Sequence, residues 1–151
     1  MTRVFKLGYT NDMNEESCVF CKIVKGELPS DIVSETKHTL TFVDLHPNNF
    51  GHCLVIPKVH YPDIYTMPDE LVSLVYTEAK RIAIATKSAV HADGVNVYMN
   101  NGEASGQVIF HAHVHIIPRH AGDELKTFPT KIYEHDGHKK EIGKKIKSFL
   151  T

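Results

Sequence analysis

Apolar and polar side chains alternate along residues 110–118, and this pattern predicts a β-strand with histidines on one face. His111, His113 and His115 are separated by Ala112 and Val114. Because successive side chains of a strand point to opposite faces, we expect the three imidazoles on one face and the apolar residues in a core. Further strands are predicted at residues 32–34, 39–45, 53–57 and 95–99, the third as an apolar run of the kind that is buried on both faces.

Apolar residues recur at helical spacing after Pro68, which predicts one long helix. Thr66 or Met67 is the expected cap, and the acidic residues that follow Pro68 suit the positive end of the helix dipole. The side chains expected to face the core are those of Leu71, Val75, Ile82, Ala83, Ala89 and Val90. A helical turn closed by Gly26 is expected at residues 18–26, and a weak amphipathic helix interrupted by Gly143 near the end of the chain.

The length of 151 residues, with 42% hydrophobic and 23% charged residues, is that of one globular domain. The fold class expected is α+β, a single domain with a mostly antiparallel sheet, one long helix and a C-terminal helix. We expect a flexible N-terminal arm at residues 1–16 and the domain itself at residues 17–151.

The net charge of −1 provides no field that would attract nucleic acid or an acidic membrane. No apolar run approaches the ~20 residues that span a bilayer, and no secretory signal is visible. We therefore expect a soluble, cytoplasmic protein without a membrane or nucleic-acid partner. In such a compartment the pair Cys18 and Cys21 indicates metal or redox chemistry rather than a disulfide framework.

Three histidines in register indicate a functional site, because burying three unpaired imidazoles would cost several kcal/mol. Residues two apart on a strand are ~6.6 Å apart, and the outer pair is ~13 Å apart. A zinc–nitrogen bond is only ~2.1 Å long, so the three rings of a flat strand cannot easily share one metal ion. At least one ring is therefore left for proton transfer or nucleophilic attack.

Residues 110–118 resemble the histidine triad (HIT) motif, in which histidines alternate with apolar residues. The segments Cys18–Ile23, Phe42–Leu45 and Gly51–His60 are also similar to segments of that family and occur in the family's order. On these segments the chain is identified as a member of the HIT family, in the branch that carries an N-terminal Cys-x-x-Cys. The resemblance implies a HIT-like domain.

The chemistry that this resemblance implies is hydrolysis or transfer at the α-phosphate of a nucleotide. His113 would be the nucleophile, while His115 and His52 would contact the phosphate oxygens and assist proton transfer. Asp44 would hold the ribose hydroxyls, although a carboxylate at this position can also simply cap a turn. The nucleotide-binding residues implied are Val19, Phe20, Phe42, Asp44, Asn100, Gly106 and Gln107.

The resemblance also implies a structural zinc ion bound by Cys18, Cys21, His60 and His111, and no organic cofactor. The residues alone leave free thiols as the alternative, since Cys-x-x-Cys supplies only two of four ligands. A homodimer is implied in the same way. The apolar stripe of the long helix allows a dimer but does not require one.

The leading functional hypothesis is a purine nucleoside phosphoramidase-like hydrolase that cleaves nucleoside phosphoramidates or adenylates, with an AMP-type nucleotide as substrate. A dinucleoside polyphosphate hydrolase is the second, favoured by residues 118–123. The third is a zinc-stabilised nucleotide-binding or partner-binding module with little turnover. Val108 stands where some family members carry serine or threonine after the glutamine, so a different leaving-group preference is expected.

Overall fold

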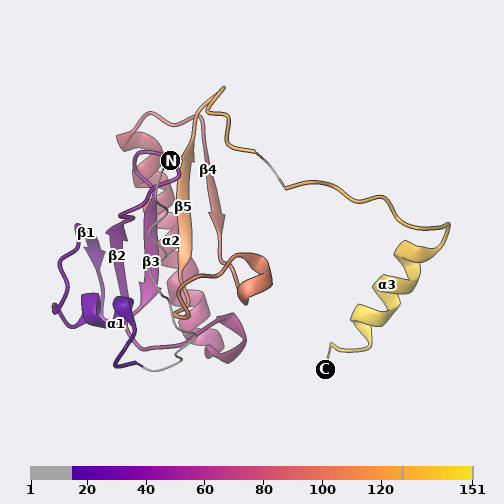
Figure 1. Ribbon diagram of the computed structural model, residues 1–151, viewed down its shortest axis with the longest axis horizontal. Coiled ribbons are helices and arrows are strands. Elements are labelled where there is room, and N and C mark those ends of the chain that lie inside the picture. Colours follow the sequence, from indigo (N-terminus) through magenta and orange to yellow (C-terminus); the bar gives the residue numbers. More distant parts are fainter. Residues whose placement is uncertain (1–14, 127, 151) are drawn as a thin grey trace, which may run out of the picture.

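The structure is a computed structural model that describes residues 15–126 and 128–150 (Figure 1). Except for its last two residues, the expected N-terminal arm lies outside the described residues. The fold is α+β, with one antiparallel sheet of five strands in the order β1-β2-β3-β5-β4. The strands are β1 (Ile32–Glu35), β2 (Thr39–Val43), β3 (Cys53–Pro57), β4 (Gly94–Tyr98) and β5 (Val114–Arg119).

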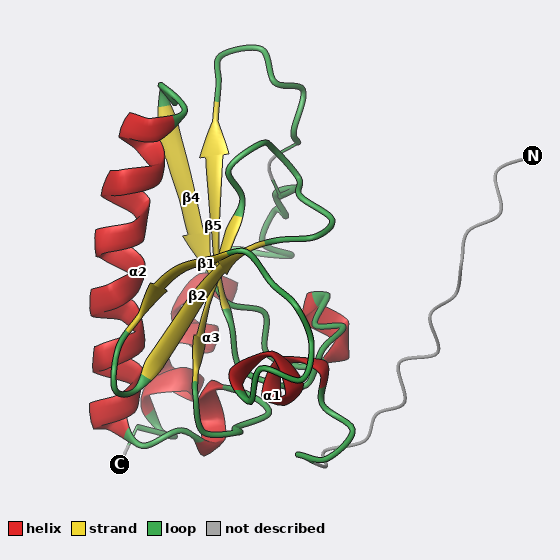
Figure 2. Ribbon diagram, turned by 90° about the vertical axis from the view of Figure 1, so that its left-hand side faces the viewer, coloured by secondary structure: helices red, strands yellow, loops and turns green. Residues whose placement is uncertain are grey.

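Two of the helices cover opposite faces of this sheet. The longest is α2 (Asp69–Ala89), which packs along one face, whereas the short α1 (Val19–Val24) lies against the other (Figure 2). Alternate residues of β3 follow this division. Cys53 and Val55 belong to the core under α2, and Leu54 and Ile56 to the core under α1. A continuous apolar run therefore forms a strand that is buried on both faces.

The histidine strand is shorter than its alternation predicts, and this prediction is corrected. β5 begins at Val114, so His111 and His113 precede it. The backbone N–H of Ala112 donates to the carbonyl oxygen of Tyr61 instead of to a neighbouring strand. The apolar side chains between the histidines nevertheless enter the core as predicted. Ala112 and Val114 are completely buried under α2.

The long helix begins later than predicted and buries a partly different stripe. Pro68 is the N-cap itself, in place of Thr66 or Met67. Val75 and Ile82 are buried as expected, but Ala89 is exposed. The buried face of the helix also includes the acidic side chain of Glu78. The Glu78 carboxylate is stabilised there by the Ser34 hydroxyl at 2.6 Å and by Arg81.

The C-terminal helix α3 (His138–Lys147) stands apart from the sheet at the end of an extended segment (Figure 1). Gly143 lies within α3 and does not interrupt it, contrary to the prediction. The apolar side chains predicted for its stripe, such as Ile142 and Ile146, are exposed. Two short 3-10 helices, η1 (Ile64–Thr66) and η2 (Glu103–Ser105), complete the described elements. Among the helices of residues 15–126 and 128–150, none combines the length and apolar character needed to cross a membrane.

Candidate active site and metal centre

The His113 side chain is held by one short hydrogen bond to the backbone. Its Nδ1 lies 2.6 Å from the carbonyl oxygen of His111. Because a carbonyl oxygen only accepts, Nδ1 must carry the ring proton, and in the neutral ring Nε2 then keeps its lone pair. Nε2 makes no hydrogen bond within the part of the chain that the structure describes. The arrangement leaves a nucleophilic nitrogen available.

His113 is buried but remains neutral. Its residue surface is 6% exposed, and its ring meets the rings of Phe20 and His115 edge to face, with centroids 5.3 and 4.8 Å apart. Burial lowers the pKa of His113, and the hydrogen bond to His111 only partly opposes this effect. At neutral pH the imidazole is therefore unprotonated at Nε2, which is the form that can attack phosphorus.

His52 and His115 form a directly hydrogen-bonded pair beside His113. The Nε2 of His52 lies 3.0 Å from the Nδ1 of His115. The backbone N–H of Asn48 donates to the Nδ1 of His52 at 3.2 Å, so this nitrogen accepts and Nε2 carries the proton. His115 then accepts at Nδ1 and keeps a proton on its own Nε2. That N–H is a donor available to an anion.

Burial keeps this histidine pair uncharged. It lowers the pKa of His115 to about 3, with further contributions from His113 and His52. The pKa of His52 is also lowered by burial, and the carboxylate of Asp44 only partly compensates. Both rings are therefore neutral hydrogen-bond donors near pH 7 rather than cations.

Asp44 makes the turn-capping contact that was the alternative to a ribose-binding role. Its Oδ1 accepts from the backbone N–H of His46 at 2.9 Å. Its Oδ2 lies 3.4 Å from the Nδ1 of His52, and the side chain is 19% exposed. One oxygen thus caps the turn, while the other stays beside the histidine pair.

The aromatic residues predicted around the nucleotide form a wall on the α1 side of the histidines. Phe20 and Phe42 pack edge to face with ring centroids 5.4 Å apart, and Val19 lies at the margin of the same cluster. Sequence reasoning missed Tyr98, whose ring stacks on His115 at 4.9 Å and 23°. The signal was the strand pairing, because β4 places Tyr98 directly opposite His115.

The loop before the histidines is braced by Gln107. Its side-chain amide donates to the carbonyl oxygens of Pro62 and Ile109, and its Oε1 accepts from the backbone N–H of Gly102. Gly106 has a φ of +91°, and a Cβ at this position would lie 3.6 Å from the Nδ2 of Asn100. The structure therefore places Asn100 and Gly106 side by side, while the Gln107 amide is occupied by the protein itself.

Four side chains from distant parts of the sequence converge on a second site. The ligand atoms of Cys18, Cys21, His60 and His111 all lie within 4.8 Å of one another. The Nδ1 of His111 is 3.5 Å from each sulfur, and the Nδ1 of His60 is 3.3 Å from the sulfur of Cys21. A tetrahedron with zinc–sulfur bonds of ~2.3 Å and zinc–nitrogen bonds of ~2.1 Å has sulfur–nitrogen edges of ~3.6 Å. The observed distances fit this geometry.

The protonation states of this cluster also suit a metal ion. The Nε2 of His111 lies 2.8 Å from the carbonyl oxygen of Pro57 and must donate to it, which leaves the lone pair of Nδ1 facing the sulfurs. Burial lowers the pKa of His111 to about 4, so the ring is neutral, as a ligand must be. Burial and the neighbouring Cys18 raise the pKa of Cys21 to about 12. A bound cation would reverse that shift and stabilise the thiolates. The residues therefore fit a structural zinc ion.

The chain is similar to curated proteins over most of its length. A HIT-like protein from Methanocaldococcus jannaschii is 45% identical over 107 residues, which is 70% of this chain and 81% of the relative. An adenylylsulfatase from Arabidopsis thaliana is 42% identical over 74% of this chain and 56% of the relative. An adenosine 5'-monophosphoramidase from Saccharomyces cerevisiae is 41% identical over 70% of this chain and 64% of the relative.

Solved structures show the same fold. A protein from Streptococcus mutans superposes with a TM-score of 0.85 at 34% identity and covers 100% of this chain and 94% of its own. A zinc-bound histidine triad family protein from Mycobacterium smegmatis has a TM-score of 0.72 at 36% identity, over 89% of this chain and 99% of its own. The family model of the HIT domain matches residues 25–122 of this chain. Together with the alternating histidines His111, His113 and His115, these matches establish that the chain belongs to the HIT domain family.

Proposed function

We propose that this protein is a nucleotide hydrolase that cleaves at the α-phosphate of nucleoside phosphoramidates or adenylates. The observation that carries the proposal is the hydrogen bond from His113 Nδ1 to the carbonyl oxygen of His111, which leaves Nε2 as a free nucleophile. Two relatives support it by their names, an adenylylsulfatase and an adenosine 5'-monophosphoramidase, because both names describe hydrolysis of a nucleotide.

The proposed reaction has two displacements at phosphorus. First, the lone pair of His113 Nε2 forms a bond to phosphorus, and the bond from phosphorus to the leaving nitrogen or oxygen breaks. The leaving atom keeps the electron pair of that bond and takes up a proton from solvent. Water then attacks the nucleotidyl-histidine, the bond from phosphorus to Nε2 breaks, and the electron pair returns to the ring. The water proton leaves to solvent, and the products are a nucleoside monophosphate and the free leaving group.

His115 and His52 would stabilise the charge that develops on the phosphate oxygens. His115 directs its protonated Nε2 away from His52, and a neutral donor in a partly buried site stabilises an oxyanion more than it would in water. Asp44 would accept from the ribose hydroxyls with its Oδ2, and Val19, Phe20 and Phe42 would contact the base or ribose. The exposed Val108 provides no hydroxyl for the leaving group, which favours substrates whose leaving group needs little assistance.

Zinc at Cys18, Cys21, His60 and His111 belongs to this proposal as a structural ion, since an ion with four protein ligands has no open coordination position. His111 would connect the ion to the nucleophile, because its carbonyl oxygen holds His113. A homodimer, a purine nucleotide of the AMP type as substrate and a cytoplasmic location are further parts of the proposal that rest on the resemblance.

The test is to incubate the full chain with an adenosine phosphoramidate and, separately, with a diadenosine polyphosphate. Faster release of AMP from the phosphoramidate is the expected result. Preference for the diadenosine compound would identify a dinucleoside polyphosphate hydrolase instead. Turnover of neither compound, with nucleotide binding retained, would identify a binding module and contradict the hydrolase.

A further inference from the structure

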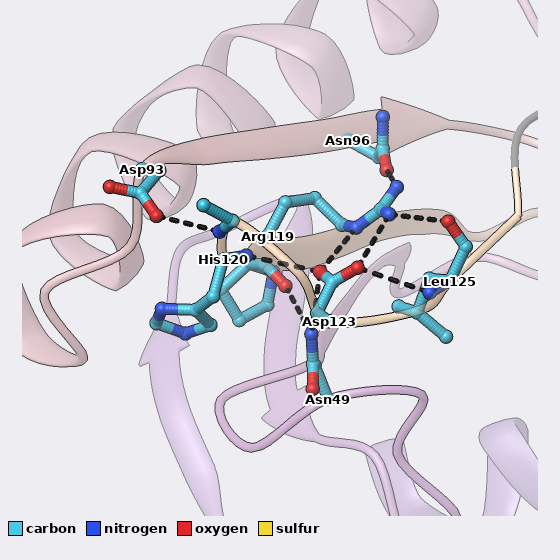
Figure 3. A network of polar contacts seen from close by, with 9 residues as sticks. Asn49, Asp93, Asn96, Arg119, His120, Asp123 and Leu125 are labelled. Carbon is cyan, nitrogen blue, oxygen red and sulfur yellow. Dashed lines mark hydrogen bonds and ion pairs between the residues drawn. The ribbon is translucent and has the colours of Figure 1, made fainter.

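A carboxylate outside the histidine site joins the end of β5 and the turn that follows it to the β2–β3 loop. Asp123 accepts hydrogen bonds at both oxygens, and its side chain is only 9% exposed. Arg119 donates to each oxygen at 2.7 and 2.8 Å, and the backbone N–H groups of His120 and Leu125 add two further bonds. Figure 3 shows the side chains of Arg119 and Asn49 directed at this carboxylate.

The contact to Asn49 reaches into the loop between β2 and β3. The Nδ2 of Asn49 donates to the Oδ2 of Asp123 at 3.1 Å and to the carbonyl oxygen of Pro118 at 3.0 Å. On either side of it, Asn48 and Phe50 are exposed. The amide of Asn49 therefore fixes the β2–β3 loop to the end of β5.

This loop supplies the hydrogen bond that sets the tautomer of His52. The backbone N–H of Asn48, next to Asn49, donates to the Nδ1 of His52 at 3.2 Å. The backbone N–H of His52 in turn donates to the carbonyl oxygen of Asn49 at 3.0 Å. Two consecutive residues of the loop thus hold His52 from both sides, and the side chain of one of them is held by Asp123.

His52 has a second arrangement within reach. Its Nδ1 is also 3.4 Å from the Oδ2 of Asp44, a contact that favours a proton on Nδ1. The amide N–H of Asn48 prevents this, because two donors cannot face each other. If the loop moved away, the ring proton would be more stable on Nδ1, and Nε2 would become an acceptor. The hydrogen bond between His52 and His115 would then reverse its direction.

We propose that Asp123, acting through Asn49, is a positioning residue that holds His52 in the tautomer that donates to His115. The consequence for His115 follows from its hydrogen bond with His52. With Nδ1 occupied as an acceptor, His115 keeps a proton on Nε2 and can donate it to the phosphate. In the reversed arrangement His115 donates to His52, and its Nε2 has no proton to offer. The inference rests on the proposed function only in one respect, the role of the His115 Nε2–H as a donor to the phosphate.

The test compares three variants in the full chain. Asp123→Asn keeps the shape of the side chain but removes its charge and replaces one oxygen by an amide N–H₂ group. Because Arg119 donates to both oxygens, this amide group must face a donor in either orientation, which weakens the carboxylate's hold on its partners. Asn49→Ala removes the other partner of the same contact and also the hydrogen bond from Asn49 to the carbonyl oxygen of Pro118. Asp93→Asn is the matched control, because Asp93 accepts from the backbone N–H of Ala121 in the same segment at 2.8 Å but does not contact Asn49.

The direct measurement is ¹⁵N NMR of the histidine ring nitrogens in the ligand-free protein. In the wild type and in Asp93→Asn, we expect His52 to show an unprotonated Nδ1 and a protonated Nε2. Asp123→Asn and Asn49→Ala should both increase the population with a protonated Nδ1. If His52 keeps its wild-type signals in the folded Asn49→Ala protein, the inference is overturned, whether or not Asp123→Asn folds.

Kinetics provide the second measurement. Both variants should lower kcat about tenfold and leave KM within about twofold, because the contact they remove does not touch the nucleotide. The double variant should be no slower than the slower single variant, since both act through one contact. A double variant whose kcat falls by the product of the two single losses would contradict the inference. An equal loss of kcat in Asp93→Asn would also contradict it. A wild type that hydrolyses no nucleotide would contradict the proposed function alone, because the tautomer is measured without substrate.

Discussion

His113 and His111 are joined by a hydrogen bond of 2.6 Å from the ring of one to the backbone carbonyl of the other. This contact connects the candidate nucleophile to a candidate zinc ligand, whose own ring is fixed by Pro57 and faces two sulfurs. The candidate metal cluster and the candidate nucleophile are therefore connected through the backbone just before β5. Changes at one should be detectable at the other.

Loss of a zinc ligand should remove the metal and destabilise the protein. We expect Cys21→Ser to bind less than one zinc per chain and to unfold at a lower temperature, because the binding free energy of a structural metal contributes to folding. Elemental analysis and thermal unfolding measure the two effects. Cys53→Ser is the control, since Cys53 is buried in β3 away from the cluster and should leave the zinc content unchanged. A full complement of zinc in Cys21→Ser would refute the ligand set.

Acid should weaken the fold through His115. An unfolded chain protonates this histidine near pH 6.5, whereas burial lowers its pKa in the folded protein to about 3. Between these values the unfolded state binds more protons, so the free energy of unfolding is highest above pH 6.5 and decreases as the pH falls. Urea unfolding at a series of pH values measures this slope.

The matched comparison for this prediction uses two glutamine variants. His115→Gln should flatten the dependence on pH between about 3 and 6.5, because it removes one of the groups that titrate differently in the two states. His135→Gln, on an exposed residue, should keep the wild-type slope. Identical slopes in the wild type and both variants would show that His115 is not shielded from protons.

The strand edge at β4 should mediate the proposed dimer. β4 is the last strand of the sheet order, and Val97 on it is 41% exposed, as is Leu74 on the adjoining α2 at 44%. We expect light scattering to give twice the chain mass of 17.0 kDa, and Val97→Asp to shift it toward the monomer. Ile32→Asp on β1, the opposite edge, is the control. A monomeric wild type would contradict the prediction.

The sequence predicted elements whose pattern is local and missed relationships that depend on distant residues. The apolar run at residues 53–57 is β3 with the expected bounds, because burial on both faces requires apolar residues throughout. Alternation overextended the histidine strand, since the backbone at Ala112 pairs with Tyr61 instead of with a strand. No local pattern signals such a partner.

The candidate site likewise has some features that a local sequence pattern predicts and others that depend on distant residues. The triad histidines were visible as a periodic motif, and the candidate metal cluster was expected only through the resemblance to a family, because its four residues come from three separate segments. The contact between Asn49 and Asp123 was not predicted. Arg119 ends β5, and Asp123 follows four residues later, a spacing that hints at an ion pair. Nothing in the sequence connects that pair to the loop of His52.

Replacement of the nucleophile should abolish turnover without unfolding the protein. We expect His113→Ala to lower kcat by at least about 10³-fold, because the proposed reaction has no other route to the nucleotidyl intermediate. Initial rates of AMP release measure this loss. The matched control is His38→Ala, since His38 is exposed and should leave the rate unchanged. An unaltered rate in His113→Ala would exclude covalent catalysis by this residue.

The most direct measurement is the detection of the nucleotidyl-enzyme itself. The wild type is mixed with an adenosine phosphoramidate, stopped with alkali during turnover and analysed by intact-mass and peptide mass spectrometry. The account predicts an adduct of one AMP group on the peptide that contains His113, and its absence from His113→Ala. Rapid turnover with no adduct, or an adduct on a different residue, would contradict it.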